Sequence, residues 1–206
     1  NLRQVSQGLE RLVSSLRKDP HALETVYLSL IVFGGKARVV TPLVELMSFY
    51  PPRLPAGAGT SLGAALNLVM DEMDRVVAKT TSEVKGDWKP IVYLFTDGKP
   101  TDDASSAIAR WKTKFSTKVD MVAIGIGPFA EMKTLGKLTE NAFLLKNENE
   151  EDFAKFVKWM TMSVSSQSQS VQSACSPGVS LAKIDNSIMI KINEIAQAAT
   201  IDEDFV

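Results

Sequence analysis

The stretch Ile91–Asp103 constrains the fold more than any other part of this chain. Its sequence is Ile-Val-Tyr-Leu-Phe-Thr-Asp-Gly-Lys-Pro-Thr-Asp-Asp. Five consecutive apolar residues, Ile91 to Phe95, predict a strand covered on both faces, as in a parallel sheet. Gly98 and Pro100 then indicate a turn. Asp97 is therefore expected at the carboxyl end of a buried strand, the edge where open α/β sheets hold ligands. The alternative is that Asp97 only caps a turn.

Hydrophobic periodicity on either side of this stretch predicts alternating helices and strands. Apolar residues at helical spacing predict an amphipathic helix from Leu2 to Leu16, and a continuous apolar run predicts a second buried strand at 119–126. A β-rich segment on each side of Gly34-Gly35 predicts a hairpin. Further helices are expected at 62–77, 104–115, 132–138 and 150–164, and a short strand at 142–145. This alternation predicts an α/β sandwich with helices on both faces of the sheet.

The length of 206 residues favours one domain and a tail rather than two domains. The domain is expected over residues 1–164. Residues 163–173 are rich in Ser and Gln, a composition typical of a flexible linker. The segment 165–206 is thus predicted to be a linker and a tail without an assigned role, which contains a β-prone piece at 188–192.

Composition excludes several classes of function. The net charge of −1 argues against a nucleic-acid or anionic-membrane partner bound through bulk charge. The single cysteine, Cys175, excludes an internal disulfide framework and a thiolate-rich zinc site, and it fits a reducing, cytoplasmic compartment. No apolar run approaches the roughly 18 to 20 residues that span a bilayer. The start of the chain does not resemble a signal peptide.

The loop Gly57-Ala58-Gly59-Thr60-Ser61-Leu62-Gly63 contains glycines at a spacing found in dinucleotide-binding turns. Such a turn must follow a strand directly, whereas this one follows the Pro-rich stretch 50–55, so nucleotide binding is not favoured. Thr60 is instead expected at the start of a helix. Its hydroxyl either caps that helix, a contribution of about 1 kcal/mol, or joins the Asp97 carboxylate as an oxygen ligand for Mg²⁺. Two ligands are too few for tight binding, so a third group is expected.

Two segments together resemble the metal-ion-dependent adhesion site of von Willebrand factor A domains. These are Gly-Thr-Ser-Leu-Gly-Ala-Ala-Leu (59–66) and Phe-Thr-Asp-Gly-Lys-Pro-Thr-Asp (95–102), which resemble the second and third parts of that site. More narrowly, the chain is similar to bacterial proteins of the tellurium-resistance TerY type over roughly residues 1–164. The stretches that carry this narrower resemblance are 14–26, Lys-Gly-Asp-Trp-Lys-Pro (85–90), Thr-Asp-Gly-Lys-Pro (96–100) and Phe-Val-Lys-Trp-Met (156–160).

The resemblance implies a mostly parallel, six-stranded sheet with one antiparallel edge strand, and it makes Thr60 and Asp97 the middle and last metal positions. The family's first metal motif, Asp-x-Ser-x-Ser on the central strand before the first helix, does not occur here, and Asp185-Asn186-Ser187 does not replace it. We therefore expect that this sequence starts just after that strand, and that the hairpin and the later strands lack a shared neighbour. The alternative is that the tail strand 188–192 fills the position.

The resemblance further implies a metal-ion-dependent protein-binding module and not an enzyme. Its Mg²⁺ or Mn²⁺ would bind only where the complete protein supplies the upstream motif, and an acidic side chain of a protein partner would complete the coordination. Proteins of this type act in cytoplasmic stress-response systems of bacteria beside kinase- and phosphatase-like partners. Two alternatives remain open: a Mg²⁺-dependent phosphotransferase or phosphatase, for which the single His21 provides no convincing base, and a metal-free interaction scaffold.

Overall fold

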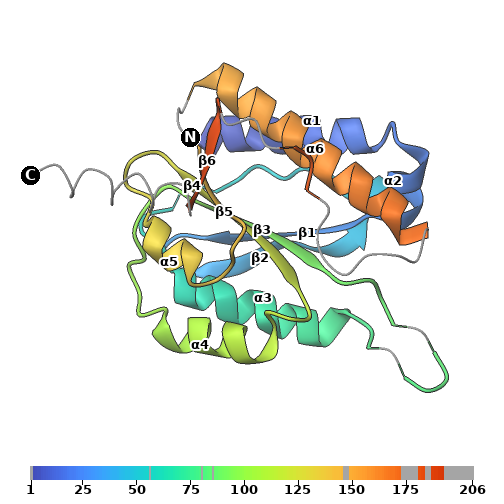
Figure 1. The fold of residues 1–206 in the computed structure, drawn as a ribbon, viewed down its shortest axis with the longest axis horizontal. Helices are drawn as coiled ribbons and strands as arrows, with labels where there is room; N and C mark the ends of the chain where they lie inside the picture. Colours follow the sequence, from blue (N-terminus) through green and yellow to red (C-terminus); the bar gives the residue numbers. More distant parts are fainter. Residues whose placement is uncertain are drawn as a thin grey trace, which may run out of the picture.

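The fold is an α/β sandwich in which helices cover both faces of the strands. The computed structural model describes residues 2–55, 57–79, 81–84, 86–145, 149–172, 181–183 and 187–192. Helices α1, α2 and α6 lie over one face, and α3 and α4 lie over the other (Figure 1). The α-helices are α1 (Leu2–Leu16), α2 (Pro20–Thr25), α3 (Leu62–Val76), α4 (Ser105–Lys114), α5 (Met132–Gly136) and α6 (Glu150–Gln172). The predicted fold class is confirmed.

The first two strands form the predicted hairpin. β1 (Tyr27–Phe33) pairs antiparallel with β2 (Ala37–Glu45), and a short 3₁₀ helix, η1 (Leu46–Ser48), follows. The second arm continues through Pro42 to Glu45. Proline lacks a backbone N–H and is tolerated at a sheet edge. β2 meets this condition, since β1 is its only partner among the described strands.

The remaining strands form a second sheet in the order β3-β4-β5-β6. They are β3 (Ile91–Thr96), β4 (Asp120–Ile126), β5 (Ala142–Leu145) and β6 (Met189–Lys191). β3, β4 and β5 are parallel, and β6 pairs antiparallel with β5 at the edge. β4 is covered on both faces as predicted, with Val122, Ala123 and Ile124 fully buried.

The two sheets are not joined by strand pairing in the described part of the chain. The expectation that the hairpin and the later strands lack a shared neighbour is therefore confirmed. The alternative that the tail strand 188–192 lies between them is wrong, because β6 pairs with β5 at the far edge. As a result β3 is covered less completely than predicted, and Ile91, Tyr93 and Phe95 are only partly buried.

Two apolar cores lie on the two faces of the strands. On one face, β4 and β5 pack against α1 and α6, where Leu16, Phe143 and Phe156 are buried. On the other face, α3 and α4 contribute Leu66, Met70 and Trp111. No helix in the described residues is both long enough and apolar enough to cross a bilayer.

Helix α6 extends further than the sequence predicts. Residues 163–172, expected to begin a flexible linker, continue the helix to Gln172. The hydroxyl groups explain the difference, because they form hydrogen bonds within the helix or across its packed face. The Ser163 hydroxyl donates to the carbonyl of Trp159, four residues earlier, at 3.0 Å. The Ser168 hydroxyl lies 2.7 Å from that of Thr25 at the end of α2.

The tail also packs on the domain where it is described. The indole Nε1 of Trp159 donates to the carbonyl of Ala182 at 3.0 Å, and the backbone N–H of Ala182 donates to the Ser163 hydroxyl at 3.0 Å. Ile188 and Met189 are buried. Cys175 and Asp185 lie outside the described residues. The described part of the tail therefore belongs to the folded unit.

Replacing Met189 by Ala tests this packing. Met189 is 0% exposed, and loss of a fully buried Met side chain costs about 2–5 kcal/mol of unfolding free energy. Met47 is 56% exposed, so the matched change Met47→Ala is expected to stay within about 0.5 kcal/mol of wild type. Urea denaturation of both variants provides the measurement. Equal stability of the two variants would show that β6 contributes nothing to the fold.

Candidate functional site

The candidate site lies where two loops meet at the carboxyl ends of the strands. The first loop, 57–61, leads into α3, and the second, 97–104, connects β3 to α4. Two hydrogen bonds hold the loops together. The N–H of Thr101 donates to the carbonyl of Thr60 at 2.9 Å, and the N–H of Thr60 donates to the Thr101 hydroxyl at 2.9 Å.

Two glycines allow this close approach. Gly59 has a φ of +87°, a conformation that favours glycine, and a Cβ there would lie 3.1 Å from the Thr101 hydroxyl. Gly63, in the first turn of α3, lies against the second loop, so that a Cβ would lie 3.0 Å from the Cα of Ala104. The glycine spacing that resembles a nucleotide-binding turn therefore serves contact between the two loops.

The first loop also contacts the end of the hairpin. The backbone N–H of Ser61 donates to the carbonyl of Gly34 at 3.1 Å, and the Ser61 hydroxyl donates to the same oxygen. Ser61 occupies the N-cap position of α3, but its side chain makes no capping hydrogen bond. The alternative in which the Thr60 hydroxyl only caps this helix is not supported either, because that hydroxyl makes no hydrogen bond to α3 in the described residues.

Asp102 caps α3 instead. Its two carboxylate oxygens accept hydrogen bonds from the backbone N–H groups of Gly63 and Ala64, at 3.1 and 2.9 Å. Asp103 instead supports the following helix, α4, because its carboxylate accepts from the backbone N–H of Ser105 at 2.9 Å. Hydrogen bonds from the Ser105 side chain and backbone lower the pKa of Asp103.

The two predicted metal ligands lie on adjoining parts of this site. The Thr60 hydroxyl lies 3.1 Å from the position of a Cβ on Gly98, which directly follows Asp97. Asp97 is exposed, and within the described residues neither its carboxylate nor the Thr60 hydroxyl has a hydrogen-bond partner. The metal role of both residues stays a prediction.

The chemistry of these donors fits a hard cation. A hydroxyl and a carboxylate are oxygen ligands of the kind that Mg²⁺ accepts while keeping several waters. No group of three or more His, Cys, Asp or Glu side chains that could hold a metal exists within the described ranges. The described residues therefore offer part of a coordination shell.

Three contributions to this site were not predicted from the sequence. Asp102 was not connected with α3, and no role was assigned to Thr101 or to Gly34. Thr101 and Asp102 follow Pro100 in the sequence, so a turn was visible. Nothing in the local pattern indicates that this turn folds back onto another helix.

Comparisons with known proteins support the fold. The model of the von Willebrand factor type A domain matches residues 1–159. A search of curated proteins finds no significant match. Among solved structures, proximal thread matrix protein 1 from the mussel byssus superposes with a TM-score of 0.54 at 16% identity over 80% of this chain and 42% of its own length.

Two further solved structures agree. A von Willebrand factor type A protein from Catenulispora acidiphila has a TM-score of 0.54 at 17% identity, over 80% of this chain and 39% of its own. The mussel protein was also solved with a zinc-occupied MIDAS (metal-ion-dependent adhesion site) motif, with a TM-score of 0.53 at 16% identity and coverage of 80% and 42%. This chain thus spans about two fifths of the length of these proteins, and at such identities the similarity concerns the fold alone.

The matched family model covers residues 1–159, more than half of the chain, and the solved structures named above share its fold. The chain belongs to the von Willebrand factor type A domain family.

Proposed function

We propose that this chain is a protein-binding module whose contact with its partner depends on a metal ion at Thr60 and Asp97. One observation carries the proposal. These two residues present side-chain oxygens without hydrogen-bond partners in the described part of the chain, on adjoining loops at the carboxyl edge. The nearby Asp102 carboxylate, by contrast, already accepts hydrogen bonds from two N–H groups of α3.

The ion we propose is Mg²⁺, or Mn²⁺ with the same oxygen preference. Thr60 and Asp97 would hold it, and further positions would be left for water and for an acidic side chain of the partner. The mussel protein, solved with a zinc-occupied MIDAS motif, supports metal binding by a protein of similar fold, although its ion is zinc. The ion would bind only if the complete protein contains an Asp-x-Ser-x-Ser motif that supplies the remaining ligands.

The biological setting we propose is a bacterial stress-response system of the tellurium-resistance type, in the cytoplasm. Its partners would be proteins of the same system, including kinase- or phosphatase-like ones, with neither nucleic acid nor a membrane as ligand. The resemblance of the stretches 14–26 and 96–100 to TerY-type proteins supports this setting.

A binding role is preferred to an enzymatic one. Hydrolysis at this site would need a nucleophile and a positioned base. The only histidine of the chain, His21, lies in α2, which precedes β1 and so sits at the opposite edge from Asp97.

Metal binding can be tested with Mn²⁺ as a paramagnetic probe. Mn²⁺ titrated into the natural full-length protein is expected to bind, to be displaced by Mg²⁺, and to bind at least about tenfold more weakly to Asp97→Ala, a loss of about 1.4 kcal/mol. Thr60→Ala is expected to weaken binding in the same direction. Asp103→Ala is the matched control, because that carboxylate lies in the same loop but is hydrogen-bonded to Ser105.

Affinity purification from the native host then tests the partner. Proteins that bind in Mg²⁺ should be lost both in EDTA and with Asp97→Ala, and should be retained with Asp103→Ala. Equal recovery with wild type and Asp97→Ala would exclude the metal-dependent role. Metal-dependent phosphate release that Asp97→Asn abolishes would favour the enzymatic alternative.

Stability measurements without metal distinguish the roles of Asp97 and Asp102. Asp102→Ala removes the cap of α3 and is expected to lower the free energy of unfolding by about 1 kcal/mol. Asp97→Ala removes an exposed carboxylate that has no partner among the described residues, and it is expected to change the free energy of unfolding by less than about 0.5 kcal/mol. Thermal denaturation in EDTA provides the comparison. A larger loss from Asp97→Ala than from Asp102→Ala would assign Asp97 a structural role instead.

A further inference from the structure

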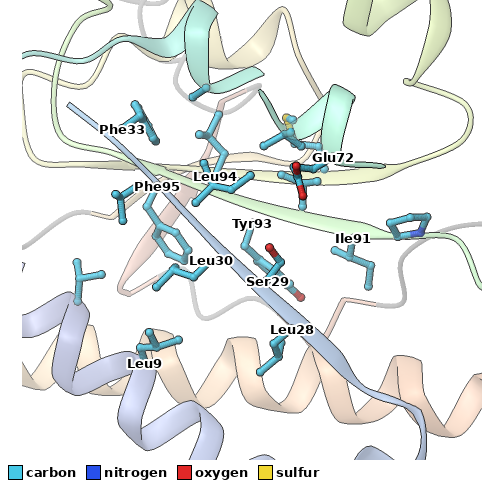
Figure 2. Close-up of a pocket in the computed structure, with 18 of the residues that line it drawn as sticks. Leu9, Leu28, Ser29, Leu30, Phe33, Glu72, Ile91, Tyr93, Leu94 and Phe95 are labelled. Atoms are coloured by element: carbon cyan, nitrogen blue, oxygen red, sulfur yellow. The ribbon is translucent and has the colours of Figure 1, made fainter. Parts of the chain in front are cut away.

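The hairpin of β1 and β2 has two edges that pair with no further strand among the described residues. The edge of β1 faces an apolar cavity of about 2230 Å³ between the two sheets. Figure 2 shows Leu28 and Leu30 of β1 lining this cavity together with Tyr93 and Phe95 of β3. The edge of β2 is the outer edge of the hairpin, and the side chains around it differ from this apolar lining.

A shallow depression of about 270 Å³ lies along the outer edge of β2. Its lining comes from β2 and from the loop that follows η1, and consists of Arg38, Val39, Val40, Arg53 and Pro55. Consecutive residues of a strand point to opposite faces of a sheet. Because three consecutive residues, 38–40, line the depression, it opens at the edge of the strand and not on one face of the sheet.

The backbone of β2 can accept another strand at this edge. In an antiparallel pair, some residues direct their N–H and C=O groups towards the partner strand, and the residues between them direct theirs away. Pairing with β1 therefore satisfies only part of the backbone groups of 37–41. Pro42 has no N–H to donate. An added strand would thus pair with the segment of β2 that precedes Pro42.

The other wall of the depression, the loop 49–55, is fixed by its own contacts. The guanidinium of Arg17 donates to three backbone carbonyls of the segment 46–49, at distances of 2.8 to 3.3 Å. Phe49 and Leu54 are buried and attach the loop to the domain. The prolines of this loop restrict its backbone further. A wall that is already ordered loses little conformational entropy when a ligand binds.

The depression carries positive charge that is not neutralised. Arg38 and Arg53 are exposed, and neither has a hydrogen-bond or ion-pair partner within the described ranges. Lys36, in the hairpin turn beside Arg38, is exposed as well. None of the five lining residues is acidic. Because a guanidinium binds a carboxylate through two parallel hydrogen bonds, the two arginines fit acidic side chains.

The charge also distinguishes between possible occupants of this edge. A second copy of the chain, paired through its own β2, would bring the arginines of both copies into one groove. Like charges that face each other across a strand pair are destabilising. An acidic segment of another protein meets both conditions, since it offers an unpaired backbone and the opposite charge.

We propose that an extended, acidic segment of a partner protein binds at the outer edge of β2. Its backbone pairs with residues 37–41 as an added strand, and its carboxylates pair with Arg38 and Arg53. This contact goes beyond the metal-dependent one and does not rest on it, because no metal ion takes part.

Binding of model peptides to the natural full-length protein in EDTA tests the proposal. The probe is a dye-labelled peptide of alternating Glu and Val, capped at both ends and followed by fluorescence anisotropy. It is expected to bind, to bind more weakly as the NaCl concentration rises, and to slow hydrogen exchange of amides within 37–41. The same peptide with Lys for Glu should not bind. A peptide with Pro for Val cannot pair as a strand and should bind at least about tenfold more weakly.

Variants of the protein test the two arginines. Arg38→Gln combined with Arg53→Gln is expected to weaken binding of the Glu peptide about tenfold, because two ion pairs are lost. The double variant should keep the unfolding temperature of the wild type, since both side chains lack partners in the described structure. Arg3→Gln is the matched control, because Arg3 is exposed on α1 and does not line the depression. Asp97→Ala should bind the peptide like the wild type, so that failure of this contact and failure of the metal site are distinguishable.

Several results would overturn the proposal. Equal affinity of the double variant and the wild type would exclude the arginines, and equal affinity for the Pro-containing peptide would exclude strand pairing. Absence of binding by the Glu peptide would leave the arginines and Pro42 as protection of an edge against pairing. Slow exchange within 37–41 that requires high protein concentration and no peptide would assign the edge to a second copy.

Discussion

The hydrogen bonds between the loops 57–61 and 97–104 are the interaction on which this structure depends. In the described residues no strand pairing connects the hairpin to the second sheet, so other contacts must hold the two in register. The Thr60–Thr101 pair of hydrogen bonds and the contact of Ser61 with Gly34 meet at one point. Three segments distant in sequence are fixed there, with packing of α1 against α6 as the second connection.

This arrangement explains why the side-chain oxygens of Thr60 and Asp97 have no hydrogen-bond partner in the described residues while those of Thr101 and Asp102 do. Thr101 and Asp102 use their side-chain oxygens to bind the first loop and the start of α3. Thr60 contributes only its backbone to that junction, which leaves its hydroxyl available. The junction thus positions two oxygen donors on a backbone that is already held by hydrogen bonds, so the proposed metal ion would require little further ordering.

The sequence predicted those features that depend on local pattern. Helical and continuous apolar periodicities located α1, α3 and β4, and the abrupt end of the run at Phe95 placed Asp97 at the carboxyl edge. Features set by contacts between distant segments could not be predicted. The Ser-rich end of α6 is helical because the Ser163 hydroxyl donates to the carbonyl of Trp159 and the Ser168 hydroxyl is hydrogen-bonded to that of Thr25. Composition does not indicate either partner. Likewise, the cap of α3 comes from Asp102, thirty-nine residues beyond Gly63.

The tail strand, β6, pairs with one of several free strand edges. Without β6, the described strands leave free the outer edges of β2 and β5, and the edges of β1 and β3 that face the cavity. β6 pairs with β5, where Trp159 and Ser163 of α6 also bond to Ala182 and fix the approach of the chain. Because the tail approaches from α6, on the side of β5, it reaches the outer edge of β5 and leaves the edges of β1 and β3 without a further strand partner among the described residues.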